Sequence, residues 1–131
     1  MLDKRFEYKN NQKKEISIFA SGDMVIPAGT DEEILMFTLP KSSLVVRAHA
    51  VVTVGTGDAA DKFDLVANEI TIGSIAAETA VADTIDITPP LYLPTGGEVK
   101  LVPAAALTAT ASFILVVEYI ETELTDGTYT D

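Results

Sequence analysis

The sequence predicts an all-β protein, a two-sheet β-sandwich that is jelly-roll-like and carries an extended N-terminal arm. It contains about eight short runs rich in β-branched and aromatic residues, separated by turn signals at intervals of roughly 8 to 12 residues. None of these runs has the length and period that favour a helix over a strand. The long connection from Pro89 to Gly97 favours a jelly-roll or Greek-key crossing over a simple meander.

The run from Ala111 to Ile120 is the most β-prone stretch of the chain. It is apolar on both faces of a strand, which is typical of a strand inside a packed sheet rather than at its edge. It closes the segment from Gly96 to Glu123, which reads as two strands joined by small residues and Pro103. We expect the earlier strands to pack around this run.

The first half of the chain contains four expected strands, with turns at Ser21 to Asp23 and at Pro27 to Gly29. The segment from Thr30 to Glu33 resembles a helix capping box, but Pro40 leaves no room for a helix after it. We therefore favour a strand there. The four strands are Glu15 to Ala20, Met24 to Ile26, about Glu33 to Leu39, and Ser43 to Val54.

The run from Ser43 to Val54 is expected to alternate strictly between two faces. One face is expected to carry Val46, Ala48, Ala50, Val52 and Val54. The other face is expected to carry Val45, Arg47, His49, Val51 and Thr53.

Three more strands are expected in the middle of the chain: Lys62 to Ala67, Glu69 to Gly73 and Asp83 to Thr88. Asn68 lies where a short hairpin turn is expected. The alanine-rich segment from Ser74 to Val81 is ambiguous and has room for a single helical turn. We expect Pro89-Pro90 to end the third strand, Leu91 to Pro94 to form an extended connection, and Thr95 to Gly97 to turn into the next strand.

A chain of 131 residues predicts one folded domain. We place a basic extended arm at residues 1–14, the β-sandwich domain at 15–123 and a polar acidic tail at 124–131. The chain has no cysteine, which excludes disulfides, thiol catalysis and cysteine zinc sites. No apolar run reaches the roughly 18 to 20 residues of a membrane span, and no apolar stretch follows the basic N-terminus. We expect no membrane contact and no export.

The net charge of −11 argues against nucleic-acid binding, because an acidic surface repels phosphates. The charge is unevenly placed. Residues 1–14 hold five basic and two acidic residues, a net +3, so the rest of the chain carries −14. The arm either docks on an acidic partner or stays solvated. Its candidate contact residues are Lys4, Arg5, Phe6, Tyr8, Lys9, Lys13 and Lys14.

Histidine and acidic candidates have simpler explanations than catalysis or metal binding. His49 is the single histidine, and Arg47 on the same face is a poor partner for a general base, so we expect a structural or interface histidine. Asp58, Asp61 and Asp64 carry oxygen ligands that calcium could use, but their spacing is not that of an EF-hand.

The remaining candidates are also expected to be structural. The glycines of Gly55 to Gly57 and of Thr95 to Gly97 do not open a helix, so neither segment should cradle a phosphate. Tyr119 is expected in the core or between sheets. Ser42, Ser43 and Ser112 have no base beside them that could activate a hydroxyl. Glu121 and Glu123 are expected to be a solvated carboxylate pair. We expect no enzyme, no cofactor and no metal.

The second half of the chain resembles the capsid-decoration, or cement, proteins of tailed bacteriophages. The resemblance runs through four segments: Lys62 to Leu65 after a glycine-rich loop, the Thr95 to Gly97 turn, Glu98 to Pro103, and Leu115 to Ile120. It covers about residues 55–121 and matches strand patterns rather than site motifs. It implies a β-sandwich or jelly-roll domain on an icosahedral shell, and it implies no functional residue.

The leading hypothesis is therefore a non-enzymatic virion protein, made in the host cytoplasm, that binds the major capsid protein on the outer capsid surface and stabilises the shell. We expect a homo-oligomer, with a trimer favoured over a dimer. One alternative is a tail or neck adaptor or a fibre-attachment module. Another is a carbohydrate- or host-surface-binding jelly roll, although a chain without tryptophan has few aromatic residues to stack on sugars.

Overall fold

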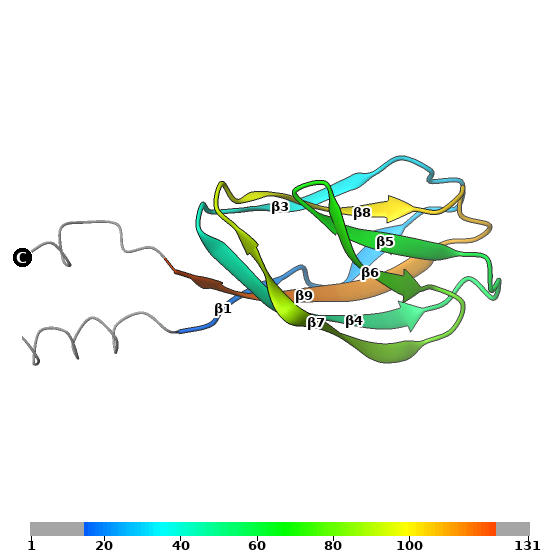
Figure 1. The fold of residues 1–131 in the computed structure, drawn as a ribbon. Helices are drawn as coiled ribbons and strands as arrows, with labels where there is room; N and C mark the ends of the chain where they lie inside the picture. The colour runs from blue at the N-terminus through cyan, green and yellow to red at the C-terminus, as the bar shows by residue number, and fades with distance from the viewer. Residues whose placement is uncertain (1–14, 123–131) are drawn as a thin grey trace, which may run out of the picture.

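The computed structural model describes residues 15–122, which form nine β-strands and no helix (Figure 1). The first four strands are β1 (Ser17–Ala20), β2 (Met24–Ile26), β3 (Ile34–Leu39) and β4 (Ser43–Val54). The other five are β5 (Lys62–Ala67), β6 (Ile70–Ala76), β7 (Val81–Leu93), β8 (Gly97–Pro103) and β9 (Ala111–Glu121).

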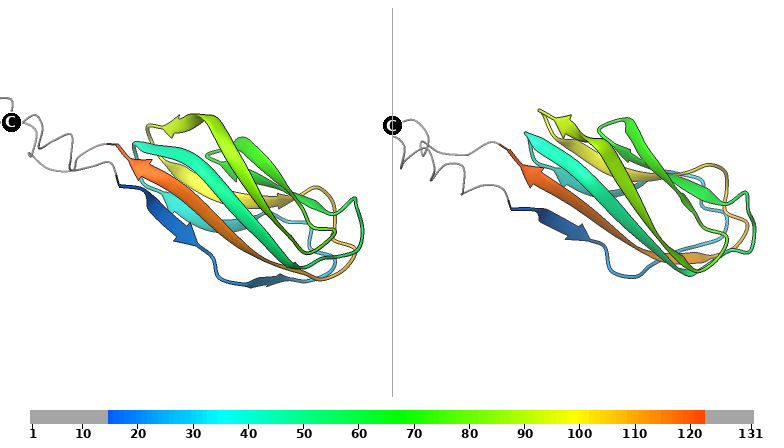
Figure 2. Two further views of the ribbon diagram at one scale, coloured as in Figure 1. Left: turned by 90° about the horizontal axis from the view of Figure 1, so that it is seen from below. Right: turned by 60° about the horizontal axis from the view of Figure 1, so that its bottom comes forward.

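The strands form two antiparallel sheets that pack face to face (Figures 1 and 2). One sheet has the order β1-β9-β4-β7, with β2 also paired to β9, and the other has the order β3-β8-β5-β6. The chain crosses from sheet to sheet at nearly every connection, and only β5 and β6 are neighbours both in sequence and in a sheet. This is a jelly-roll topology, which confirms the predicted fold class.

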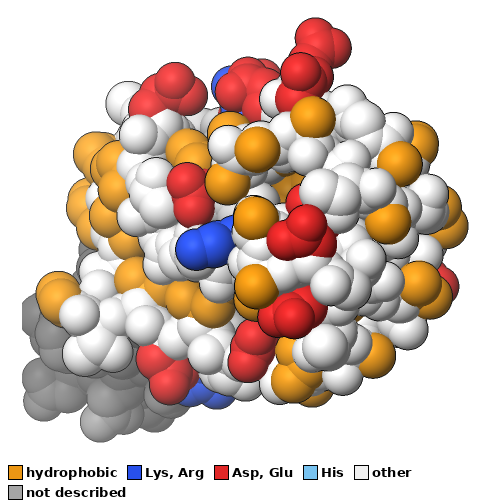
Figure 3. Space-filling view, turned by 90° about the vertical axis from the view of Figure 1, so that its right-hand side faces the viewer, with side chains coloured by type: hydrophobic (Ala, Val, Ile, Leu, Met, Phe, Trp, Pro, Cys, Tyr) orange, Lys and Arg blue, Asp and Glu red, His pale blue; other side chains and the backbone are white. Residues whose placement is uncertain are grey.

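The two ends of the sandwich differ in what they carry. Strand β1 begins and β9 ends at the same end, where the Thr122 amide donates to the Ser42 carbonyl. The opposite end carries the β2–β3, β4–β5, β6–β7 and β8–β9 loops, and acidic side chains stand out around it (Figure 3). The exposed acidic residues in or beside these loops include Asp31, Glu32, Glu33 and Glu78.

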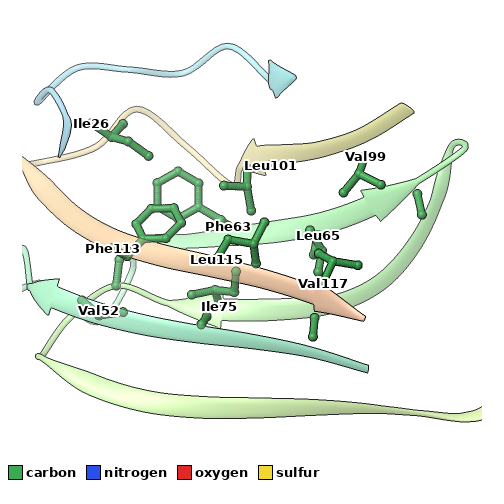
Figure 4. Close-up of a cluster of buried hydrophobic side chains, with 14 of the residues drawn as sticks. Ile26, Val52, Phe63, Leu65, Ile75, Val99, Leu101, Phe113, Leu115 and Val117 are labelled. Carbon is green, nitrogen blue, oxygen red and sulfur yellow. The ribbon is translucent and has the colours of Figure 1, made fainter. Parts of the chain in front are cut away.

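Large apolar side chains from both sheets fill the space between them (Figure 4). Phe63 of β5 and Phe113 of β9 meet across the sandwich with ring centroids 5.2 Å apart. Strand β9 is flanked by β4 and by β1 and β2, so it lies inside its sheet as the sequence predicted. At the β1 edge, Phe19 stacks on Phe37 of the other sheet at 4.2 Å, and Tyr119 packs beside Phe37.

The predicted alternation of β4 is wrong at its start. The pairing of β4 with both neighbours shifts between Val45 and Arg47, where a β-bulge adds one residue. Val45, expected beside Arg47 on the outside, is therefore fully buried, whereas Val46 is only half-buried. A second shift after Val52 leaves Val54 exposed.

Two predicted boundaries are also corrected. Strand β7 does not end at Pro89-Pro90 but continues to Leu93, because it is an edge strand whose pairing with β4 skips from Asp86 to Leu91. The prolines lie in the skipped stretch and remove no ladder hydrogen bond. Strand β6 extends through Ala76, which pairs with Lys62, so the possible helical turn there is not formed.

Candidate interaction surface

The outward side of the five-stranded sheet is the most distinctive surface of the described residues, and we call it the outer sheet face. Its members alternate along each strand with buried residues such as Ala48, Ala50 and Val117. Figure 2 looks onto this side of the sheet, across which β1, β9, β4 and β7 run. The outer sheet face comprises Ile16, Ile18, Ala20, Val25, Leu44, Arg47, His49, Val51, Val54, Ala82, Thr84, Asp86, Tyr92, Ser112, Ile114, Val116, Glu118 and Ile120.

A hydrogen-bonded polar cluster lies at the centre of this face. His49 Nε2 is 2.5 Å from Glu118 Oε2, and His49 Nδ1 is 3.2 Å from Thr84 Oγ1. Arg47 lies beside the same glutamate, with Nη1 3.9 Å from Oε1, and its Nε is 3.6 Å from Asp86 Oδ1. The Glu118 side chain is only 14% exposed, so its two oxygens are largely shielded from water by the partners that they bind.

Strand register explains why these five side chains meet. Arg47 pairs directly with Glu118 on one side and with Asp86 on the other, and His49 pairs with Thr84. His49 reaches Glu118 diagonally across neighbouring strands, which is within the range of long side chains. The bulge after Val45 sets this register, because it turns Arg47 and His49 outward while Val45 turns inward.

The cluster contains a hydroxyl, an imidazole and a carboxylate in line, the residue types of a hydrolase triad. Such a triad also needs hydrogen-bond donors aimed at the developing oxyanion. On a sheet face the backbone donors of β4 and β9 lie in the plane of the sheet and pair with neighbouring strands. The arrangement therefore fits a structural or interface histidine, as the sequence indicated for His49.

Apolar side chains surround the polar cluster. The described residues include nine exposed large hydrophobic side chains, and six of them lie on the outer sheet face: Ile16, Ile18, Val25, Val51, Val54 and Tyr92. Ile18 is 63% exposed at the β1 edge. Contiguous exposed apolar surface of this kind marks interaction sites in soluble proteins.

The charge of this face also differs from that of the rest of the domain. Residues 15–122 contain fifteen acidic and four basic residues, a net charge of −11. Of these, the outer sheet face holds Arg47, Asp86 and Glu118, a net −1. The remaining described residues hold −10, and they include Asp23, which accepts a hydrogen bond from Thr53 of β4. The outer sheet face is thus both apolar and nearly neutral.

The outward side of the opposite sheet is acidic by contrast. Lys100 of β8 is surrounded there by three glutamates, with its Nζ 2.9 Å from Glu33, 3.5 Å from Glu98 and 3.8 Å from Glu69. The Glu33 carboxylate, which accepts a hydrogen bond from the ammonium group, raises the pKa of Lys100 above its usual value. One cation among three anions leaves this cluster at −2.

The three aspartates considered for calcium are each engaged separately. Asp61 is 4% exposed and accepts hydrogen bonds from the Thr108 hydroxyl at 2.6 Å and the Thr108 amide at 3.2 Å. The hydrogen bond from the Thr108 hydroxyl has the largest effect in holding the pKa of Asp61 below its usual value, and a hydrogen bond from the Thr56 hydroxyl adds to it. Asp58 accepts from the Ala60 amide, and Asp64 from the Ser74 hydroxyl. Within residues 15–122, no group of three or more His, Asp or Glu side chains is placed to hold a metal ion.

The other sequence candidates occupy structural positions. Gly57 and Gly96 have positive φ angles in loops, and Ser43 donates to the Pro40 carbonyl. Tyr119 packs against the core next to Phe37, as predicted.

The part of the chain that the structure describes has no helix long and apolar enough to cross a membrane. The seven arm candidates from Lys4 to Lys14, like Glu123, lie outside the described residues.

Sequence reasoning missed Glu118 as the partner of His49 and Thr108 as the partner of Asp61. One signal was present, because Glu118 is the single charged residue between Ala111 and Ile120. A lone carboxylate in so apolar a strand indicates a specific partner. Thr108 carried no comparable signal.

The fold resembles chains from three solved phage capsid structures. A chain of the cyanophage Pam1 capsid asymmetric unit aligns with a TM-score of 0.61 and 14% identity, over 84% of this chain and 87% of that one. A chain of the Ralstonia phage GP4 capsid aligns with a TM-score of 0.56 and 11% identity, over 87% and 89%. A chain of the acid-stable capsid of Helicobacter pylori bacteriophage KHP30 gives 0.56 and 11%, over 85% and 97%. At these identities the likeness is one of fold. No protein-family model and no curated protein matches the sequence.

Proposed function

We propose that this chain is a non-enzymatic structural protein of a phage virion that binds the outer surface of the capsid shell and stabilises it. The observation that carries the proposal is the jelly-roll fold, which aligns over most of its length with chains of three phage capsids. The strand-pattern resemblance to decoration proteins, found in the sequence independently of the fold, supports the same role.

The proposed partner is the major capsid protein, and the proposed contact is the basic arm of residues 1–14. That arm carries +3, whereas the described domain carries −11, so an acidic shell would attract the arm and repel the domain. Ordering the arm on the shell costs conformational entropy. Many copies on a symmetric lattice would offset that cost by avidity, so each contact can be weak.

The test uses capsid shells assembled from the major capsid protein of the same phage, with binding measured by co-sedimentation. The full chain should sediment with the shells, and a chain lacking residues 1–14 should remain in the supernatant while its circular dichroism stays that of a β-sandwich. A chain lacking residues 124–131 is the matched control, and it should bind like the full chain. Unchanged binding without the arm would exclude the arm as the contact.

The distribution of bound copies separates this function from a tail or neck adaptor. Labelled protein should be spread over the whole shell. Label confined to a single vertex would instead indicate a component of the tail or neck. Correctly assembled shells that bind none of the labelled protein would overturn the virion proposal.

A further inference from the structure

We propose that the outer sheet face is the surface on which two copies of this chain pack against each other about a twofold axis. This contact is between identical chains, so the inference does not rest on the proposed virion function. Four features of the face carry it: its size, its apolar character, its low charge and the pairing of opposite charges within it.

The size of the face is close to what a stable pair needs. The sheet is four strands wide, and β9 has 11 residues. At about 4.8 Å between strands and about 3.3 Å per residue, the face measures about 19 Å by about 36 Å, or about 700 Å². A standard interface buries about 800 Å² on each partner, so this face alone approaches the required area.

The composition of the face favours a sheet-on-sheet contact. Flat sheets pack face to face through their side chains, as the two sheets of this domain already do. Ile18 of β1, Val51 of β4 and Tyr92 of β7 are all exposed, so apolar contacts are available across the width of the sheet. We would expect fewer of the domain's exposed large hydrophobic side chains on a face that contacts only water.

Electrostatic repulsion between two acidic domains depends on which surface of one faces the other. Two domains that each carry −11 repel one another, and the repulsion is strongest where the acidic residues lie. The outer sheet face holds only −1 of that charge, so two copies approach each other at least electrostatic cost through it. By the same argument the arm is the poorer occupant, because a segment of +3 gains more from the rest of the domain, which holds −10.

The polar residues near the centre are self-complementary. A twofold interface brings the same patch of both copies together, so each charged group must find its opposite within that patch. Arg47 and Asp86 lie side by side in one row and are 48% and 71% exposed, so both still have room for a further partner. A twofold axis near this row places Arg47 of each copy opposite Asp86 of the other.

The experiment measures solution mass by light scattering over a range of micromolar concentrations. The full chain should approach twice its mass of 14.0 kDa as the concentration rises. Val51→Lys and Ile18→Lys, on two different strands of the face, should each raise the dissociation constant of the pair about tenfold or more, because a charge would be buried in an apolar contact. Leu35→Lys is the matched control, since Leu35 is 55% exposed on the opposite sheet, and it should leave the constant unchanged.

Each outcome decides the proposal. Circular dichroism and thermal unfolding should show all three variants folded, because the substituted side chains are exposed. A full chain that stays monomeric throughout would overturn the pairing, and loss of shell binding in the same two variants would then assign the face to the shell. A trimer, the oligomer favoured from the sequence, would also overturn it, because a single twofold face joins only two copies.

Discussion

His49 of β4 and Glu118 of β9 lie 2.5 Å apart, Nε2 to Oε2, at the centre of the outer sheet face. They are 69 residues apart in sequence and come together because β4 and β9 pair along most of their length. The contact joins the single histidine to the single charged residue between Ala111 and Ile120, and the other members of the polar cluster contact one or the other of these two side chains or, in the case of Asp86, their neighbour Arg47.

A double-mutant cycle should detect this pair. Replacing either residue with alanine removes the hydrogen bond between them and leaves His49 with Thr84 alone, or Glu118 with Arg47 alone, so the two losses should not add. We expect a coupling energy of about 1 kcal/mol from urea unfolding of H49A, E118A and the double variant. Additive losses would mean that the two side chains do not stabilise each other in solution.

Asp61 should contribute stability at neutral pH and lose that contribution in acid. Its pKa in the folded chain lies below the reference value of 3.8, so its contribution is complete above about pH 4 and disappears as the pH falls through the folded value. Asp61→Asn should lower the urea midpoint at pH 7, and the difference from the unchanged chain should narrow in acid. Asp31→Asn, in an exposed loop, is the control. A difference that stayed constant with pH would contradict the prediction.

Lys100 should show the opposite dependence, at alkaline pH. Its pKa in the folded chain lies above the reference value of 10.5, so its contribution is complete below that pH and is lost as the pH rises through the folded value. Lys100→Gln should lower the urea midpoint at pH 7, because Glu33, Glu69 and Glu98 then lose their shared cation. The difference in urea midpoint between this variant and the unchanged chain should become smaller above about pH 10.5. It should also become smaller in high salt, which screens the charges. An equal difference at all these conditions would point to lost packing instead.

Phe113 should be among the costliest side chains to truncate. It is fully buried and meets Phe63 across the two sheets, so Phe113→Ala leaves a cavity that neither sheet can close. We expect a loss of about 3–5 kcal/mol in the free energy of unfolding, measured in urea. Leu35→Ala, at an exposed position of β3 on the opposite sheet, should change it by less than about 0.5 kcal/mol.

Alanine substitutions at Gly96 and Gly22 distinguish the free-energy cost of a left-handed backbone conformation from the cost of a steric clash. The φ angles of the two glycines are nearly the same, +71° and +73°. A Cβ at Gly22 would meet nothing within 4 Å, whereas one at Gly96 would lie 2.3 Å from the Leu39 carbonyl oxygen. Gly22→Ala should therefore cost only the left-handed conformation, about 1–2 kcal/mol, and Gly96→Ala should cost clearly more. Equal urea midpoints for the two variants would show that the turn at Gly96 moves aside.

The sequence predicted the strands well because a period of two and turn residues are local properties. The expected runs for β2, β4 and β5 match the observed strands, and Asn68 lies in the β5–β6 turn. The faces of β4 were harder, because the bulge beside Val45 depends on pairing with β7 and β9. The continuation of β7 through Pro89-Pro90 depends in the same way on its place at an edge, which no local pattern indicates.

The candidate site was less predictable than the fold. His49 and Arg47 could be placed together from the alternation of one strand, but their partners come from other strands. Glu118 and Asp86 join them only because β4 lies between β9 and β7 in the jelly-roll order. The low charge of the outer sheet face likewise emerges only when the acidic residues are distributed over two sheets and their loops.

The sequence by itself determined that this chain is all-β, that Ala111 to Ile120 is a central strand, and that a basic segment precedes an acidic domain. Each of these follows from the order of residue types along the chain. Only the tertiary structure decided which strands are neighbours, which side chains meet His49, and which sheet face is apolar and nearly neutral. The physical reason is that strand pairing and bulges join residues far apart in sequence, and register, not composition, sets which side of a sheet each residue faces.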